Sequence, residues 1–141
     1  MHYFDTNHCV KIHDEIINLT GGKLGILNEG LIESILIHSR NDQYYPTLED
    51  KVTHLLFSFV KNHCFVDGNK RSAVALSAYM LEINAYENMV SNYMVKLENI
   101  TIDVALNSIS KDLLKKIVTA LIYDGEYSEE LKIEIINAKN N

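Results

Sequence analysis

The chain has 141 residues, of which 47% are hydrophobic, and carries a formal net charge of −6. This size and apolar content predict one domain over residues 1–141 with its own core. The acidic balance argues against general binding to nucleic acid or to an anionic membrane. No stretch reaches the roughly 18 apolar residues of a membrane span. Two cysteines, Cys9 and Cys64, are too few for a disulfide scaffold, and no leader pattern precedes them, so we expect a cytoplasmic location.

The first part of the chain predicts two helices joined by glycine-containing turns. Thr6 or Asn7 is a candidate cap for the first helix, which Gly21-Gly22 ends. His13 lies on the apolar face of this helix, and we interpret it as a packed residue that bonds a backbone group. Residues 30–39 carry apolar side chains at helical spacing and predict the second helix.

The middle of the chain predicts the central buried helix. Residues 40–46 are polar and aromatic with little helical character. Thr47 and Asp50 then resemble a capping box. The helix that they start has a continuous apolar face, and it ends just before His63. After the loop that follows, apolar spacing from Ser72 onward predicts another helix.

The last part of the chain also favours helices. Residues 93–97 indicate one, and residues 100–109 fit either a strand or a helix, of which we prefer the helix. Ser110 caps a clearer helix that Asp124-Gly125 ends, and Ser128 is a candidate cap for the final one. The expected fold class is therefore all-α.

The segment His63–Arg71 carries the residues most suited to chemistry. Lys70 and Arg71 can grip phosphate oxygens, and Asp67 offers the hard oxygen ligand that Mg²⁺ prefers. Because the segment leads into a helix, the unpaired N–H groups of that helix point to where a phosphate would sit. The imidazole of His63 suits a base that takes a proton from an attacking hydroxyl. The pattern indicates transfer of a phosphorus group to a hydroxyl.

Two further residues complete this segment. Gly68 lets the backbone turn tightly and approach a ligand closely. Asn69 lies where its side chain can cap the helix or donate its amide to a phosphate oxygen.

At these positions the chain resembles the Fic/Doc family, and within it the death-on-curing (Doc) branch. The family pattern is His-x-Phe-x-Asp/Glu-Gly-Asn-Gly-Arg, with a second Arg after two more residues. The Doc branch has Lys instead of the second Gly and lacks the last Arg. In this chain Lys70 occupies the position of that Gly and Val74 occupies the position of that Arg. The resemblance extends over roughly residues 5–86. It implies an all-α Fic-fold helical bundle with a short β-hairpin or extended flap near residues 40–46.

The resemblance also implies roles for single residues. His63 would be the catalytic base and Asp67 the Mg²⁺ ligand, and the flap would dock the target through Asp42, Tyr44 and Tyr45. The anion hole and the grip on the phosphates of ATP would consist of Gly68, Asn69, Lys70 and Arg71.

A toxin of a toxin–antitoxin system is the activity that the resemblance implies. Doc-type toxins transfer phosphate from ATP to a threonine of the translation factor EF-Tu and so arrest translation. Two alternatives stay open, which are transfer of AMP to a protein hydroxyl and a catalytically silent module that binds a nucleotide or a partner. Since Val74 replaces the Arg that pairs with an internal inhibitory Glu in some Fic proteins, control by a separate Phd-like antitoxin is expected.

Overall fold

A computed structural model describes residues 1–140 and confirms the all-α prediction for them. Within this range no β-strand is present, and the only β-type pairing is an isolated antiparallel bridge between Ile26 and Phe65. The elements are α1 (Thr6–Thr20), α2 (Glu29–His38), α3 (Leu48–Lys61), α4 (Asn69–Glu82), the 3₁₀ helix η1 (Glu87–Met89), α5 (Val90–Ala105), α6 (Lys111–Tyr123) and α7 (Glu129–Lys139).

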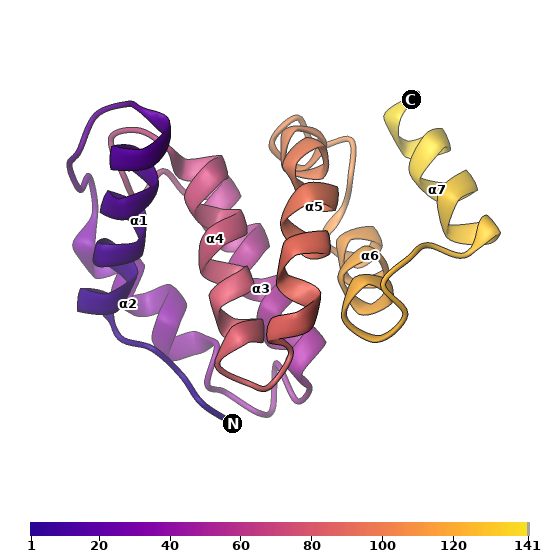
Figure 1. The fold of residues 1–141 in the computed structure, drawn as a ribbon, viewed down its shortest axis with the longest axis horizontal. Coiled ribbons are helices and arrows are strands. Elements are labelled where there is room, and N and C mark those ends of the chain that lie inside the picture. The colour runs from indigo at the N-terminus through magenta and orange to yellow at the C-terminus, as the bar shows by residue number, and fades with distance from the viewer. Residues whose placement is uncertain (141) are drawn as a thin grey trace.

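Helix α3 is the central element, as the sequence predicts. Figure 1 shows α1, α4, α5, α6 and α7 following one another across the molecule, with α3 behind α4 and α5. The α3 side chains are buried along most of its length, and it contacts α4, α6, α5 and α2. Helices α3 and α4 therefore pack against each other, and the loop of residues 62–68 connects them.

Side-chain caps start five of the helices and explain their boundaries. Thr47 and Asp50 form the predicted capping box of α3, and Ser110 and Ser128 cap α6 and α7 as expected. The prediction for α1 was wrong, because Asp5 caps it by accepting a hydrogen bond from the backbone N–H of His8. A carboxylate is as good an acceptor at this position as a hydroxyl or an amide.

The ambiguous segment 100–109 continues α5 as far as Ala105 and then turns. The helix preferred from the sequence is thus confirmed. Ile100 and Val104 are buried on one face of α5, while Ile102 is 47% exposed, so the burial follows a helical and not an alternating pattern.

Residues 40–46 form turns without strand pairing, so the β-hairpin expected for a flap at this position is absent. Lys51 of α3 fixes this loop, since its buried ammonium donates to the backbone oxygen of Ser39 over 3.0 Å and to Asp42 over 2.7 Å. Tyr45 stacks on His54 with a ring-centroid separation of 4.3 Å, while Tyr44 is 69% exposed. The loop therefore packs against the N-terminal half of α3.

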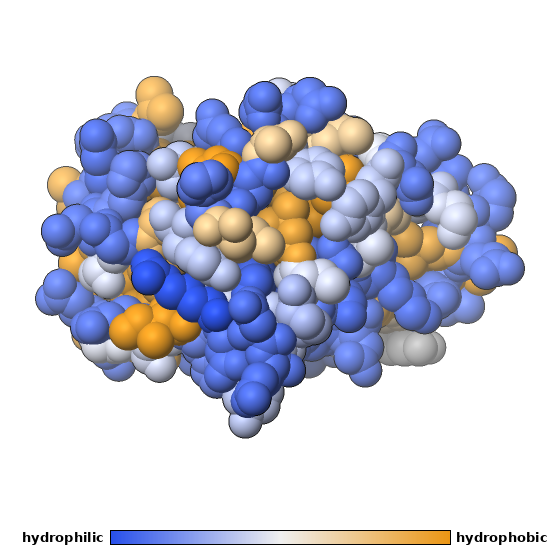
Figure 2. All heavy atoms as spheres, turned by 90° about the horizontal axis from the view of Figure 1, so that it is seen from below, coloured by the Kyte–Doolittle hydropathy of each residue, from blue (hydrophilic) through white to orange (hydrophobic). Residues whose placement is uncertain are grey.

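The outer surface is mainly polar. Figure 2, which views the molecule from below, shows hydrophilic atoms over most of that face and hydrophobic atoms in separate patches. None of the helices described in residues 1–140 has the length and apolar content needed to cross a membrane.

Candidate active site

The loop between α3 and α4 is anchored by its apolar residues. Cys64 and Phe65 are 0% and 1% exposed, whereas the flanking His63 and Val66 lie at the surface. The backbone of Cys64 accepts a hydrogen bond from the N–H of Leu27 over 2.8 Å, and the N–H of Val66 donates to Gly25 over 3.0 Å. The loop thus lies along the segment that joins α1 to α2, with the His63 side chain free to meet a ligand.

Asn69 closes the turn before α4. Its amide nitrogen donates to the backbone oxygen of Phe65 over 2.9 Å, and its amide oxygen accepts from the N–H of Phe65 over 3.1 Å. The side chain is therefore occupied in shaping the loop, and it does not cap α4. Asn69 remains positioned to offer its backbone N–H at the start of the helix.

The N-terminus of α4 has no side-chain cap. Its cap residue is Gly68, with φ +74° in the left-handed region, and the first helical bond there runs from the N–H of Ser72 to Gly68 over 2.8 Å. The N–H groups of Asn69, Lys70 and Arg71 precede that bond. Since such groups carry the positive end of the helix dipole, the geometry suits a phosphate.

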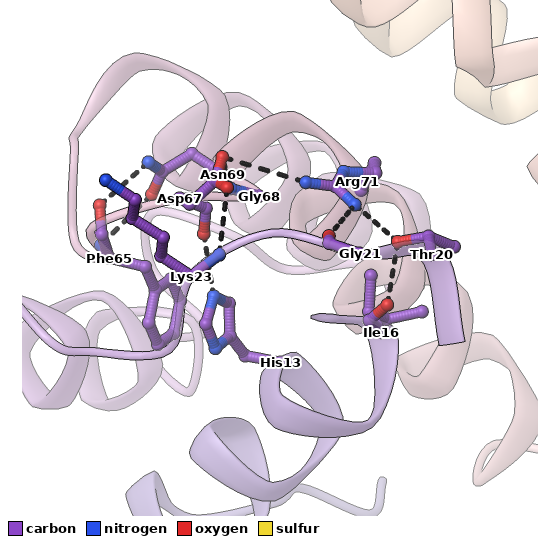
Figure 3. Close-up of polar contacts among 10 residues, drawn as sticks. All are labelled: His13, Ile16, Thr20, Gly21, Lys23, Phe65, Asp67, Gly68, Asn69 and Arg71. Atoms are coloured by element: carbon purple, nitrogen blue, oxygen red, sulfur yellow. Dashed lines mark hydrogen bonds and ion pairs between the residues drawn. The ribbon is translucent and has the colours of Figure 1, made fainter. Parts of the chain in front are cut away.

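Asp67 joins this turn to the end of α1 (Figure 3). One carboxylate oxygen accepts from the backbone N–H of Lys23 over 3.0 Å, and the other accepts from the N–H of Gly68 over 2.8 Å and lies 3.7 Å from the Arg71 guanidinium. These two backbone donors, with smaller contributions from Arg71 and the Lys23 ammonium, hold the pKa of Asp67 below its ordinary value.

The Asp67 side chain fits the requirements of a Mg²⁺ ligand. It is 43% exposed and ionised, and its oxygens have lone pairs beyond those that its hydrogen-bond partners use. The described residues contain no group of three His, Cys, Asp or Glu side chains placed to hold a metal. A carboxylate that binds Mg²⁺ together with phosphate oxygens and water needs no such group.

Arg71 is held beside Asp67. Its guanidinium donates to the backbone oxygen of Gly21 over 2.8 Å and to the hydroxyl of Thr20. The exposed Lys70 and Arg71 both line a groove of about 470 Å³ between α1, α4 and α5. The predicted phosphate grip is therefore brought together with the uncapped start of α4.

The structure does not bring Asp42, Tyr44 and Tyr45 to this site. They precede α3, whereas His63 follows it, and a helix of 14 residues is about 21 Å long. Figure 1 shows the two loops at opposite ends of the α3–α4 pair. A flap at residues 40–46 thus cannot hold a target segment beside His63. The segment that does lie beside the loop is 25–28, in which the sequence shows no residue pattern that indicates chemistry.

His13 is the other residue whose place at the site the sequence did not reveal. It is 0% exposed and bonds the backbone oxygen of Asp67 through Nε2 over 2.8 Å, which confirms its interpretation as a packed residue with a backbone partner. The partner lies in the loop of residues 62–68, which we call the motif loop, and no local pattern in α1 could have indicated it.

A family model described as "Fic/DOC family" matches residues 3–81. The chain belongs to the Fic/DOC family. It is 33% identical to "Toxin Doc" of Mycolicibacterium smegmatis over 102 residues, which cover 66% of this chain and 78% of that protein. It is also 30% identical over 89 residues to "Uncharacterized protein RP474" of Rickettsia prowazekii, covering 62% of this chain and 33% of that protein.

The matched range contains the loop between α3 and α4 and the start of α4. It runs through α1, α2 and α3 and almost to the end of α4, and so includes the loop and the contacts that α1 makes with it. Helices α5 to α7 lie beyond the Fic/DOC match, although α5 completes the groove beside Lys70 and Arg71.

Proposed function

We propose that this protein is a Doc-type toxin that uses ATP and Mg²⁺ to phosphorylate a hydroxyl of a translation factor, with a threonine of EF-Tu as the expected target. The observation that carries the proposal is the uncapped N-terminus of α4 between Asp67 and the cations Lys70 and Arg71. The similarity of the chain to "Toxin Doc" supports the toxin role. Translation factors are cytoplasmic, so the proposed site of action is the cytoplasm.

Each residue has one task in the proposed reaction. The N–H groups that start α4, with Lys70 and Arg71, bind the phosphate oxygens and orient the γ-phosphate. Asp67 would hold Mg²⁺, which when bound neutralises charge on the phosphates. The hydroxyl oxygen of the target forms the new bond to the γ-phosphorus, the bond to the β–γ bridging oxygen breaks, and ADP leaves. His63 accepts the hydroxyl proton.

Lys70 supports phosphate transfer over AMP transfer. In this family pattern a Gly at its position leaves open the space that a Lys side chain fills, so the bulk and charge of Lys70 favour an ATP orientation with the γ-phosphate toward His63. The test is a reaction with ATP and purified translation factors, followed by intact-protein mass spectrometry. A phosphate-sized increase that His63→Ala abolishes is expected, and an AMP-sized increase would refute the kinase assignment. Lys70→Gly should move the product toward AMP.

The segment Leu24–Leu27 is the proposed docking site for the target. Leu24, Ile26 and Leu27 are 56%, 40% and 62% exposed, and Ile26 forms the bridge to Phe65. An extended target segment could pair with this free edge and place its hydroxyl near His63.

The groove between α1, α4 and α5 is the proposed binding site of a Phd-like antitoxin. Ile16, Val74, Met94 and Ile102 make it apolar, and a disordered antitoxin segment could fold into it beside the phosphate grip. The test mixes the purified protein with the product of the neighbouring gene. Ile102→Asp should weaken the complex, while Ile136→Asp on α7, at a similarly exposed position, should not. Absence of both complex and inhibition in the unaltered protein would refute the partner.

A further inference from the structure

His13 is enclosed between α1 and the motif loop. Its ring stacks on Phe65 with centroids 3.8 Å apart and planes 7° from parallel, and the side chain is 0% exposed. Its Nδ1 lies 3.0 Å from the carboxylate of Asp14, and its Nε2 lies 2.8 Å from the backbone oxygen of Asp67. Figure 3 shows the ring rising from α1 toward the loop. Contacts on three sides therefore fix its orientation.

The direction of the key hydrogen bond follows from its partner. A backbone carbonyl can only accept, so Nε2 carries the hydrogen and donates to Asp67. The same nitrogen would lie 3.7 Å from a Cβ at Gly68, so the ring lies beside the left-handed turn that starts α4. A single side chain thus holds the carbonyl of the peptide that joins the expected Mg²⁺ ligand Asp67 to Gly68, the residue that precedes α4.

We propose that His13 is a positioning residue that fixes the Asp67–Gly68 backbone in the orientation needed to bind Mg²⁺ and the phosphates of the nucleotide. This inference rests on the proposed function for its ligand. The carboxylate of Asp67 and the N–H groups of α4 act on one ligand, and a small rotation of the Asp67–Gly68 peptide would turn both away from it. Phe65 and Asp14 act through His13 by holding its ring.

The other buried histidine provides a matched control. His54 is 5% exposed, its Nε2 bonds the backbone oxygen of Ile35 over 3.1 Å, and its ring stacks on Tyr45. It packs against the loop at the far end of α3 from His63. Loss of His54 should therefore lower stability in the same way as loss of His13 without changing the phosphate site.

The test compares His13→Phe with His54→Phe, since Phe keeps an aromatic ring and removes the donor. The first measurement is calorimetric binding of the non-hydrolysable analogue AMP-PNP with Mg²⁺. We expect His13→Phe to weaken binding by about 10- to 100-fold, the usual cost of losing a residue that orients a ligand group. His13→Gln, which has an N–H donor, should recover part of the loss, and His54→Phe should bind like the unaltered protein.

The second measurement is hydrogen exchange of the Gly68 amide, which needs no nucleotide. This N–H bonds the Asp67 carboxylate over 2.8 Å, so exchange should accelerate in His13→Phe and not in His54→Phe. If Phe cannot be accommodated, His13→Leu takes its place in both measurements. A folded His13 variant with unchanged exchange, or an equal effect of the His54 variant, overturns the proposal. If the unaltered protein binds no nucleotide, the proposed function fails, and the exchange result alone decides the role of His13.

Discussion

The backbone N–H of Lys23 donates to the carboxylate of Asp67 over 3.0 Å, although the two residues are 44 positions apart. Arg71 makes a second long-range hydrogen bond between the same two regions, because its guanidinium donates to the backbone oxygen of Gly21 over 2.8 Å. The end of α1 and the start of α4 are thus joined by the side chains that the proposed reaction needs. Changes in the α1–α2 connection should therefore affect activity.

Gly22→Ala should disrupt this junction. A Cβ at Gly22 would lie 2.5 Å from the Asp67 carboxylate and 3.2 Å from the Arg71 guanidinium. Gly22 also has φ +124°, a conformation that costs other residues about 1–3 kcal/mol. We expect transfer activity to fall more than about tenfold in kcat/KM, equivalent to about 1.4 kcal/mol of transition-state stabilisation.

Gly21→Ala is the control for backbone strain. Gly21 has φ +90°, but a Cβ there would meet nothing within 4 Å. Its cost in thermal stability should not exceed that of Gly22→Ala, and its loss of kcat/KM should be clearly smaller. Equal losses of activity would mean that strain, and not the contact with Asp67, is responsible.

Asp67→Asn should abolish most activity while the protein stays folded. The amide has nearly the same shape but no charge for a cation, so we expect a loss of at least about 100-fold in turnover at fixed Mg²⁺. Thermal unfolding should shift only modestly, because the amide oxygen of Asn can still accept one of the two backbone hydrogen bonds. A variant that keeps activity over a full Mg²⁺ titration would remove Asp67 from the site.

Titration of Asp67 should not contribute to the pH dependence of activity above the ordinary pKa of an aspartate, 3.8. Because hydrogen bonds from Lys23 and Gly68 lower its pKa below the usual 3.8, the carboxylate stays ionised in the folded protein at that pH. Its contribution to stability is therefore complete above pH 3.8 and is lost as the pH falls through the lower folded value. In a pH–rate profile between 5 and 8, replacement of Asp67 should change the amplitude and leave the shape of the acid limb to other groups.

His54 should make the whole fold less stable in acid. Burial lowers its pKa from 6.5 to about 4, despite the opposing hydrogen bond to Ile35. Below pH 6.5 His54 therefore binds a proton in the unfolded chain but not in the folded chain. The free energy of unfolding decreases as the pH falls from 6.5 to about 4. The loss should approach about 3 kcal/mol in urea unfolding. His54→Gln cannot titrate, so a loss of the same size in that variant would exclude His54 as its source.

The parts of the fold that local sequence rules describe were predictable. The capping box of Thr47 and Asp50, the caps Ser110 and Ser128 and the glycine end of α1 depend on neighbouring residues, and all are present. Asp5 was missed because carboxylates, amides and hydroxyls near a helix start are equivalent candidates. The loop His63–Arg71 was found because its chemical groups are adjacent in the chain.

What the sequence could not supply were contacts across the fold. Asn69 has the side chain of a cap or a phosphate ligand, yet it bonds the backbone of Phe65, a choice set by how the loop closes. The bond from His13 to Asp67 spans 54 positions. The family resemblance implied a docking flap with Asp42, Tyr44 and Tyr45, but only the direction of α3 decides at which end of the molecule that loop lies.

The location of target docking can be tested with two exposed residues. Leu27 is 62% exposed beside the motif loop, and Tyr44 is 69% exposed at the other end of α3. Leu27→Asp should raise KM for the protein target by about tenfold, the effect of roughly 1.4 kcal/mol of lost contact, while AMP-PNP binding stays unchanged. Tyr44→Ala should change neither.

The reverse result would have a definite meaning. If Tyr44→Ala raised KM and Leu27→Asp did not, the target would have to contact the molecule at both ends of α3, since the transferred phosphate and His63 lie at one end only. A rise in KM for both variants would indicate a target surface that follows α2 and α3 along their length. Only an effect confined to Leu27 supports pairing of the target with the free edge of residues 24–27, where Ile26 already bridges to Phe65.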